Sequence, residues 1–403
     1  MNPNQFAGPW LNRIRTCRAA LFFVPALWVS KDLVLEKIFG GFPWGLTGYS
    51  QYNNLLFLQW AQIGGIHLLT FLVILGNILL LRVAAKRGRA WLLVLAVIPL
   101  LHAAGWLMLR VHLERLQVLP LENAAIVQPN VTPDDHLRFG SIDLALEKLL
   151  EESRTLVRQG ASLIIWPEYT IPVYPLQDYR YGDIFDRFAL DEVPLLAGFT
   201  DLQGLDRIYN SVILFYPGGR SKYDKVRLTP FGEYIPFRRL LFFVRRITDE
   251  IGDFTPGAKA TNLYLNDLVI APPICYEIIY PGLVNSFVRK GAQVIITTSN
   301  DSWFGRTAAP YQHLSMAVLR AVENRRYVLR STSNGVSALI ESSGIIRRRS
   351  AYGRQDAFLA PFHRLSGKTF FSSVGFLFPY LCVLFSLLIP GKKLLSFLWR
   401  AAK

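Results

Sequence analysis

Three residues of the chain have the types needed for nucleophilic catalysis, and each stands beside a stretch that restricts the backbone. Glu168 follows the apolar run 162–166 and a proline, and Cys275 follows Pro272-Pro273-Ile274. Lys225 lies in the stretch 223–236, which is rich in aromatic, glycine and proline residues. Sites in α/β folds commonly lie where strands end. The positions of Glu168 and Cys275 therefore predict site residues.

A cysteine, a carboxylate and a lysine can together carry out acyl transfer. A thiolate is a strong nucleophile, and the thioester that it forms stays reactive enough to be cleaved by an amine. A nearby carboxylate with a raised pKa can take the thiol proton, and a lysine can stabilise the negative oxygen that forms when the thiolate attacks an ester. Taken singly, each residue type is more often structural, as an inert core cysteine or a solvated charge.

The composition predicts membrane segments. Hydrophobic residues make up 51% of the 403 residues and charged residues only 18%, a balance that is rare in water-soluble enzymes of this length. The net charge of +15 favours nucleic acid or an anionic membrane surface as partner. Because the basic excess flanks apolar segments and no nucleic-acid motif occurs, we expect no nucleic-acid partner. Cys17 and Cys382 are too far from Cys275 in sequence to indicate a disulfide framework or a metal site.

Four apolar segments, at about 19–38, 62–81, 91–109 and 369–390, each approach the roughly 20 residues needed to span a bilayer. The first is interrupted by four charged residues, which are Lys31, Asp32, Glu36 and Lys37. Charges facing lipid are costly, so we expect this helix to pack against others.

Basic clusters predict the topology. They precede the first segment, separate the second from the third, and follow the fourth: Arg13, Arg15 and Arg18; Arg82, Lys86, Arg87 and Arg89; Lys392, Lys393, Arg400 and Lys403. Basic loops stay in the cytoplasm, so both termini are expected inside. The predicted domains are then membrane helices over 1–111, an outer domain over 112–367, and a last membrane helix with a basic tail over 368–403. In a bacterium with two membranes this places the outer domain in the periplasm, and no cleavable signal peptide is evident.

The outer domain alternates strand and helix patterns. Short β-rich runs occur at 124–127, 163–165 and 294–297, and residues 141–159 place leucines at helical spacing among charged residues. Such alternation predicts a layered α/β domain.

The stretches around Glu168, Lys225 and Cys275 resemble the Glu-Lys-Cys triad of the nitrilase superfamily in order and context. Within it, nearly the whole chain is similar to the apolipoprotein N-acyltransferase family. The matching motifs are Gly41-Phe42-Pro43-Trp44, Gly48-Tyr49-Ser50-Gln51, Gly64-Gly65, Val127-Gln128, Tyr209-Asn210-Ser211, the Lys225 to Glu233 stretch, Ile274-Cys275-Tyr276-Glu277, Asn300-Asp301-Ser302-Trp303-Phe304-Gly305, Gln312-His313, Arg320-Ala321-Val322-Glu323 and Asn334-Gly335.

The resemblance implies an αββα nitrilase-like sandwich attached to a transmembrane helical bundle. It implies roles for Glu168 as general base, Lys225 as oxyanion stabiliser and Cys275 as nucleophile, without a cofactor or metal. Accessory positions of the family fall on Glu233, Tyr276 and Glu277. In the family, a phospholipid such as phosphatidylethanolamine acylates the cysteine, and the acyl group passes to the α-amine of a diacylglyceryl-cysteine at a lipoprotein N-terminus.

The chain departs from the family pattern in two places. The family usually has eight membrane helices against four expected here, so the resemblance is to a short form without the N-terminal helices. Pro129 stands where the family commonly has glycine, and the tryptophan often found a few residues later is absent.

Two further stretches are candidates for contact with lipid. Residues 236–248 hold four arginines among aromatic and aliphatic residues, which fits either an ordinary amphipathic helix or an arm that binds lipid. The expected lipid contacts are Phe237, Leu241, Phe242 and Phe243, together with Trp303 and Phe304. For His313 we expect a helix-packing or capping role rather than a proton relay.

Two alternative functions remain open at the level of the sequence. The same triad in a membrane-tethered amidase or nitrilase-like hydrolase would use water or ammonia chemistry. A chain that lacks part of the helical bundle would serve instead as a catalytically silent membrane scaffold.

Overall fold

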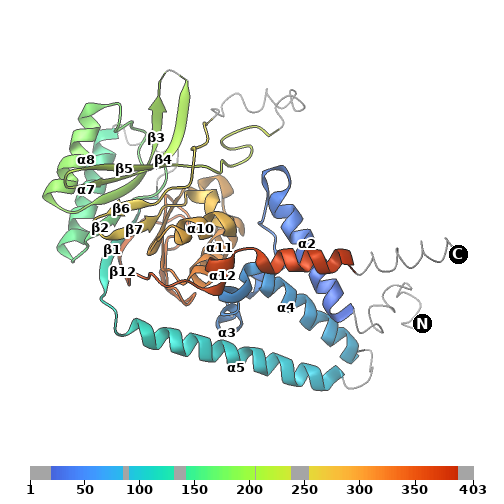
Figure 1. Ribbon diagram of the computed structural model, residues 1–403. Coiled ribbons are helices and arrows are strands. Elements are labelled where there is room, and N and C mark those ends of the chain that lie inside the picture. The colour runs from blue at the N-terminus through green and yellow to red at the C-terminus, as the bar shows by residue number, and fades with distance from the viewer. Residues whose placement is uncertain (1–19, 85–89, 131–141, 205, 237–253, 389–403) are drawn as a thin grey trace. The chain divides into compact units, whose positions relative to one another are not determined.

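A computed structural model describes residues 20–84, 90–130, 142–204, 206–236 and 254–388 (Figure 1). The chain divides into two compact units. The first comprises Met1–Arg115 and Lys368–Lys403, and the second comprises Leu116–Gly367.

The first unit is helical. Its elements are α2 (Ala20–Lys37), η2 (Ile38–Gly40), η3 (Thr47–Gln51), α3 (Leu55–Leu58), α4 (Ala61–Ala84), α5 (Ala90–Leu116), α12 (Phe370–Val374) and the helix Leu377–Leu388. Within the described residues, α4 and the Val94–Leu116 part of α5 are long and apolar enough to cross a membrane. Helix α4 is kinked where Gly65 adopts a φ of 64°.

The charged residues of α2 are accommodated by packing. Asp32 and Glu36 are buried, whereas Lys31 and Lys37 are exposed. The Glu36 carboxylate lies 3.5 Å from Nε2 of His67 on α4. The expected fourth segment is interrupted, since Gly375 ends α12 with a φ of 61° before Leu377–Leu388 begins.

The second unit contains two six-stranded sheets. The first has the order β12-β1-β2-β3-β4-β5 and the second β11-β10-β9-β8-β7-β6. The first sheet consists of β12 (Asp356–Phe362), β1 (Glu122–Gln128), β2 (Leu163–Ile165), β3 (Leu195–Gln203), β4 (Arg207–Tyr216) and β5 (Gly219–Asp224). The second consists of β11 (Ile346–Arg349), β10 (Ala338–Ile340), β9 (Val328–Thr332), β8 (Val294–Ser299), β7 (Leu268–Ala271) and β6 (Leu263–Leu265). The central strands β1, β2 and β3 pair in parallel, as do β7, β8 and β9.

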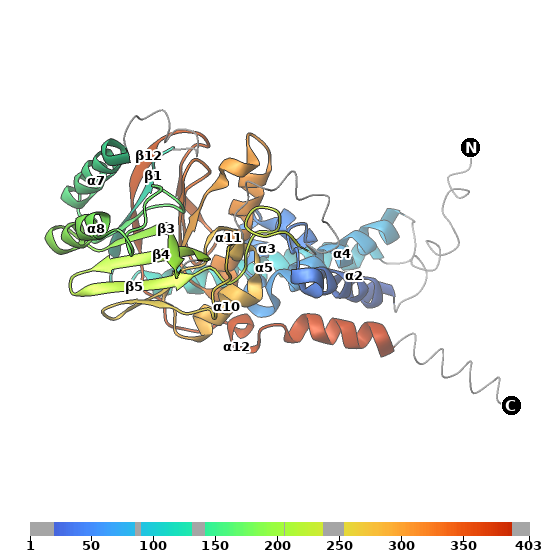
Figure 2. The ribbon, with the colours of Figure 1, turned by 90° about the horizontal axis from the view of Figure 1, so that it is seen from above.

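Helices cover the outer face of each sheet, which gives the αββα layering that the resemblance implies (Figure 2). They are α7 (Ile142–Arg158) and α8 (Tyr179–Asp191) on one side, and α10 (Pro281–Arg289) and α11 (Ala309–Asn324) on the other. Hydrogen bonds join the two sheets directly, because Ser331 Oγ on β9 donates to the Val127 carbonyl on β1 at 2.8 Å. The predicted helix over 141–159 is confirmed as α7, and the three predicted strands are confirmed within β1, β2 and β8.

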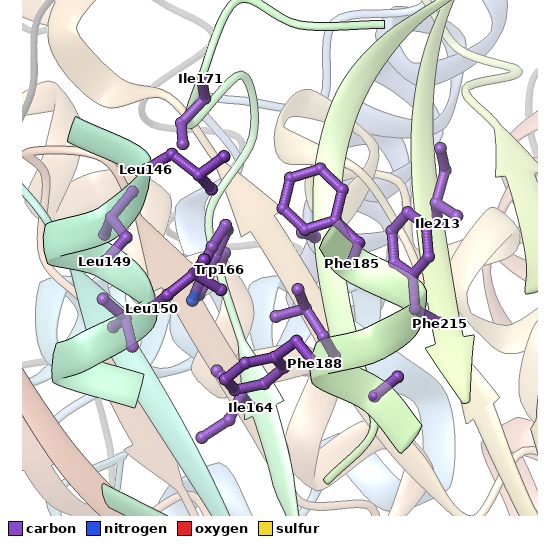
Figure 3. Packing of buried hydrophobic residues seen from close by; sticks show 14 of the residues in the cluster. Leu146, Leu149, Leu150, Ile164, Trp166, Ile171, Phe185, Phe188, Ile213 and Phe215 are labelled. Carbon is purple, nitrogen blue, oxygen red and sulfur yellow. The ribbon is translucent and has the colours of Figure 1, made fainter. Parts of the chain in front are cut away.

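The core under α7 and α8 fixes the end of β2. Leu146, Leu149 and Leu150 recur at helical spacing on the buried face of α7. They pack with Trp166, which follows β2, and with the aromatic rings of α8 (Figure 3). The Trp166 ring meets Phe185 edge to face, and its indole N–H donates to Ser153 Oγ at 3.0 Å. The chain is thus immobilised two residues before Glu168.

Candidate active site

Each predicted catalytic residue follows a strand. Glu168 comes shortly after β2, Lys225 directly after β5, and Cys275 opens the short helix η5 (Cys275–Ile279) after β7. Gly198 on β3 leaves room for Glu168, because a Cβ there would lie 2.6 Å from the Glu168 Cα. The site therefore draws on both sheets of the second unit.

Lys225 joins two carboxylates. Its Nζ lies 2.9 Å from Glu233 Oε1 and 3.4 Å from Glu168 Oε1. Lys225 and Glu168 are only 1% and 3% exposed, so these charges interact with little screening by water. Thr229 contributes its backbone N–H, which donates to Glu233 Oε2 at 2.7 Å. The structure brings Glu168, Lys225 and Glu233 together.

Asn210 on β4 bridges the same carboxylates. Its Nδ2 donates to Glu168 Oε1 at 2.7 Å and to Glu233 Oε1 at 2.6 Å. The other oxygen of Glu168 accepts from the backbone N–H of Asn300 at 2.8 Å. Both oxygens of the expected base are thus held in place.

The two carboxylates differ in their affinity for a proton. Burial raises the pKa of Glu168 more than Lys225 lowers it, and the charge of Glu233 raises it further. Burial also opposes the charge of Glu233, but Lys225 and the hydrogen bonds from Thr229 and Asn210 hold its pKa below the ordinary value. Such divergence assigns different roles to neighbouring carboxylates. Glu168 is the one suited to accept a proton, and Glu233 stays ionised.

Lys225 remains charged in this setting. Burial alone would lower the pKa of its ammonium, but Glu233 and Glu168 outweigh burial and raise it. A permanent cation next to a nucleophile can stabilise a developing oxyanion.

Cys275 sits at a sharp turn and is only partly buried. Its φ of 49° is uncommon for a residue other than glycine, asparagine or aspartate, and it turns the chain abruptly from the run after β7 into η5. Burial and the charge of Glu168 raise the pKa of the thiol above its ordinary value, despite the opposing effect of Lys225. At neutral pH the resting sulfur is therefore protonated, and attack requires a base.

Glu277 stabilises the turn that carries the nucleophile. Its carboxylate accepts from the backbone N–H of Ile274 at 2.9 Å and from those of Val226 and Arg227 at 2.8 and 3.0 Å. It also accepts from the Tyr223 hydroxyl at 2.8 Å. Burial raises the pKa of Glu277 to about 7, although these backbone hydrogen bonds act in the opposite direction. Glu277 thus ties the residues next to Cys275 to those next to Lys225.

The structure also describes Tyr276, Trp303 and Phe304, the remaining accessory and lipid-contact residues predicted within the described ranges. Tyr276 is buried, and its ring meets that of Tyr280 edge to face. Trp303 is 76% exposed on η6 (Asp301–Phe304), whereas Phe304 is half-buried against His313. The other four expected lipid contacts lie outside the described residues: Phe237, Leu241, Phe242 and Phe243.

Several residues of the site were not assigned a role from the sequence. Asn210 and Asn300 donate to Glu168, and Ser299 contacts the Cys275 sulfur. Asp301 accepts from Ser299 and from Arg330. Asn210, Asn300 and Asp301 lie in motifs that match the family, which was the signal available. His313, for which a packing or capping role was expected, is fully buried, and its Nε2 lies 3.1 Å from the backbone carbonyl oxygen of Cys275. Within the described ranges, no group of three or more His, Cys, Asp or Glu residues could hold a metal ion.

Two family models match separate parts of the chain. Residues 123–353 match the carbon-nitrogen hydrolase family, and residues 5–79 match the apolipoprotein N-acyltransferase N-terminal domain. The apolipoprotein N-acyltransferase of Geobacter metallireducens is 32% identical over 90% of this chain and 72% of its own length. That of Azotobacter vinelandii is 35% identical over 84% of this chain and 67% of its own length. Among solved structures, a mutant of the Nesterenkonia AN1 amidase from the nitrilase superfamily aligns with a TM-score of 0.47 and 17% identity, over 61% of this chain and 93% of that one. The chain belongs to the apolipoprotein N-acyltransferase family.

Proposed function

We propose that this enzyme transfers a fatty acyl group through a thioester on Cys275 to the N-terminal amine of an apolipoprotein, with Glu168 as base and Lys225 as oxyanion stabiliser. The observation that carries the assignment is the ammonium of Lys225, which is held between Glu168 and Glu233 beside the turn at Cys275. Family membership supports the acceptor, because the relatives are named for acylation of apolipoproteins.

The first half-reaction forms the acyl-enzyme. Glu168 takes the thiol proton, and the thiolate attacks the carbonyl carbon of an ester, whose oxygen becomes negative beside Lys225. When the tetrahedral intermediate collapses, the alkoxide of the donor leaves and takes the proton from Glu168. The products are a Cys275 thioester and a free alcohol.

The second half-reaction regenerates the enzyme. The α-amine of the diacylglyceryl-cysteine attacks the thioester carbonyl, and Lys225 again faces the oxyanion. Glu168 removes a proton from the nitrogen, and that proton returns to the departing sulfur. An amide forms, and the thiol is restored.

The family resemblance and the chain's apolar helices support a lipid donor and a membrane setting. We propose a membrane phospholipid of the phosphatidylethanolamine type as donor, which would leave as a lyso-lipid. We further propose a multi-pass protein of the bacterial inner membrane, with residues 112–367 in the periplasm, on the basis of the basic clusters. An alkaline phosphatase fusion at residue 200 should be active outside the cytoplasm, and an inactive fusion would refute this orientation.

Complementation tests the function. In a strain depleted of its own lipoprotein acyltransferase, the wild-type gene should restore growth, and mass spectrometry should detect an N-linked acyl chain on a reporter lipoprotein. The variant Cys275→Ala, expressed at the same level, should restore neither. A reporter that keeps its free α-amine in the presence of wild-type protein would point to a hydrolase or a silent scaffold.

A further inference from the structure

One hydroxyl group faces both the nucleophile's sulfur and a buried carboxylate. Ser299 Oγ, at the end of β8, lies 3.2 Å from Cys275 Sγ and 2.7 Å from Asp301 Oδ1. A serine hydroxyl carries a single proton, so it donates to one of these atoms and can only accept from the other. Whether the hydroxyl donates to Asp301 or to the sulfur depends on the charge of Asp301 and on its other hydrogen-bond partners.

Asp301 is a fixed anion. Arg330 Nη2 donates to its Oδ2 at 2.7 Å, and neither side chain is exposed to solvent. Burial would raise the pKa of Asp301, but Arg330 outweighs burial and holds it well below the ordinary range. Gly335 lies directly against the carboxylate, because a Cβ at that position would be 2.3 Å from Asp301 Oδ2. The carboxylate is thus both ionised and confined.

His313 also lies near Asp301, since its Nδ1 is 3.2 Å from Asp301 Oδ1, so the hydrogen bond to that oxygen depends on the tautomer of the ring. Nε2 faces the carbonyl of Cys275, which can only accept, so Nε2 carries a hydrogen. Burial and the charge of Arg330 lower the pKa of His313, which keeps the ring neutral. The Nδ1 lone pair then accepts from Arg330 Nη2 at 3.1 Å. Asp301 Oδ1 therefore takes its hydrogen bond from Ser299, whose oxygen is left to accept the S–H of the resting thiol.

We propose that Ser299 is a further catalytic residue, whose hydroxyl accepts from the Cys275 thiol at rest and turns to donate to the thiolate once Glu168 has taken the proton. No proton is gained or lost at Ser299, because its O–H only rotates, so that its hydrogen bond to Asp301 Oδ1 is replaced by one to Sγ, while Arg330 continues to neutralise Asp301. The inference rests on Cys275 being the nucleophile. The next residue along the chain supports it, because the Asn300 N–H holds Glu168 and the same strand end thus contacts base and nucleophile.

The hydrogen bond should favour the thiolate over the thiol. Charged and titratable groups from several elements face the sulfur or its backbone, namely Glu168, Tyr169, Lys225, Asp301 and His313. A change in the titration of Cys275 is therefore interpretable only between variants that keep these side chains in place, as substitutions at Ser299 do, although Asp301 loses one hydrogen bond when the hydroxyl is removed.

A matched set of variants isolates the hydroxyl. Ser299→Ala removes it, and Ser299→Thr and Ser299→Val form a pair of equal shape that differs only in the hydroxyl. Thr298→Val is the control, because Thr298 is also buried and its hydroxyl has no hydrogen-bond partner among the described residues. The probe is iodoacetamide, with the alkylation rate of Cys275 followed against pH by mass spectrometry, and phospholipid is used in parallel to measure acyl-enzyme formation.

We expect Ser299→Ala and Ser299→Val to raise the apparent pKa of the thiol by about one unit and to slow both reactions about tenfold at neutral pH, the effect of losing a hydrogen bond to an anion. Ser299→Thr and Thr298→Val should behave like wild type. The inference would be overturned if Cys275 were alkylated at the same rate in Ser299→Val and Ser299→Thr at every pH. This comparison holds even if Ser299→Ala fails to fold. Absence of an acyl group on wild-type Cys275 would instead overturn the proposed function.

Discussion

Asn210 donates a 2.7 Å hydrogen bond to Oε1 of Glu168, the oxygen that also faces the ammonium of Lys225. The amide therefore stabilises the charged form of the expected base. Because burial already raises the pKa of Glu168, this hydrogen bond opposes a further rise.

Replacement of Asn210 by alanine should reduce the fraction of Glu168 that is ionised at neutral pH and so able to accept a proton. Loss of the hydrogen bond raises the pKa of Glu168, so the acidic limb of the rate profile should shift to higher pH, with about tenfold slower acyl-enzyme formation at neutral pH. The control is Asn262→Ala, which removes another buried asparagine whose amide donates to the carbonyls of Phe287 and Lys290. An unshifted profile in Asn210→Ala would show that the bridge is only structural.

Glu168→Gln tests the base itself. In the wild type the reaction needs ionised Glu168, so its rate should be present above the raised pKa of this carboxyl and lost as the pH falls through it. Removing the base should slow acylation at least about 100-fold. Alkylation of Cys275 should then recover only at high pH, because the thiol pKa is itself raised. Glu147→Gln on the exposed face of α7 is the control. Neutral-pH alkylation of Glu168→Gln at the wild-type rate would exclude Glu168 as base.

The sequence was most informative where local chemistry restricts the backbone. Apolar runs followed by proline located Glu168 and Cys275 at strand ends, and leucine spacing located α7. It did not assign a role to Asn210 or Ser299, because a single polar residue within a strand pattern does not indicate a site, and only the pairing of distant strands brings these two residues to it. Asn300 contacts Glu168 through its backbone N–H, which every residue except proline has, so its residue type gave no signal for this contact. The positive φ of Cys275 and the break at Gly375 likewise follow from tertiary context.

Strand β3 approaches Glu168 so closely at Gly198 that adding one methyl group there should slow the reaction. Gly198→Ala should displace the backbone at Glu168, since the new Cβ would lie 2.6 Å from its Cα. We expect acyl-enzyme formation to fall by about tenfold or more, as misplacement of a catalytic group by a fraction of an ångström is costly. Gly367→Ala, where a Cβ meets nothing within 4 Å, should have no effect on the rate. Equal rates in the two variants would contradict the packing described for this strand.

The pair of Asp301 and Arg330 predicts a stability effect. Asp301→Asn leaves Arg330 buried without a carboxylate and should destabilise the second unit by about 3 kcal/mol or more. Because the folded-state pKa of Asp301 is lowered, its contribution is present above the ordinary carboxyl pKa and is lost only as the pH falls through the lowered value. The difference in free energy of unfolding between wild type and Asp301→Asn, measured with denaturant in detergent, should therefore be constant from pH 7 to about pH 5. Asp143→Asn, at an exposed pair with Arg180, should cost less than about 1 kcal/mol. A similar small cost for Asp301→Asn would contradict the account of this pair.

Detection of the covalent intermediate tests the central claim most directly. Purified protein is incubated with phospholipid in the absence of an acceptor and then digested. The mass of the peptide that contains Cys275 is measured by mass spectrometry before and after treatment with hydroxylamine. The account predicts an acyl mass on Cys275 of the wild type that hydroxylamine removes, a large loss of this species in Lys225→Ala, and none in Cys275→Ala. An acyl group on a different residue, or acyl transfer to a reporter lipoprotein by Cys275→Ala, would contradict it.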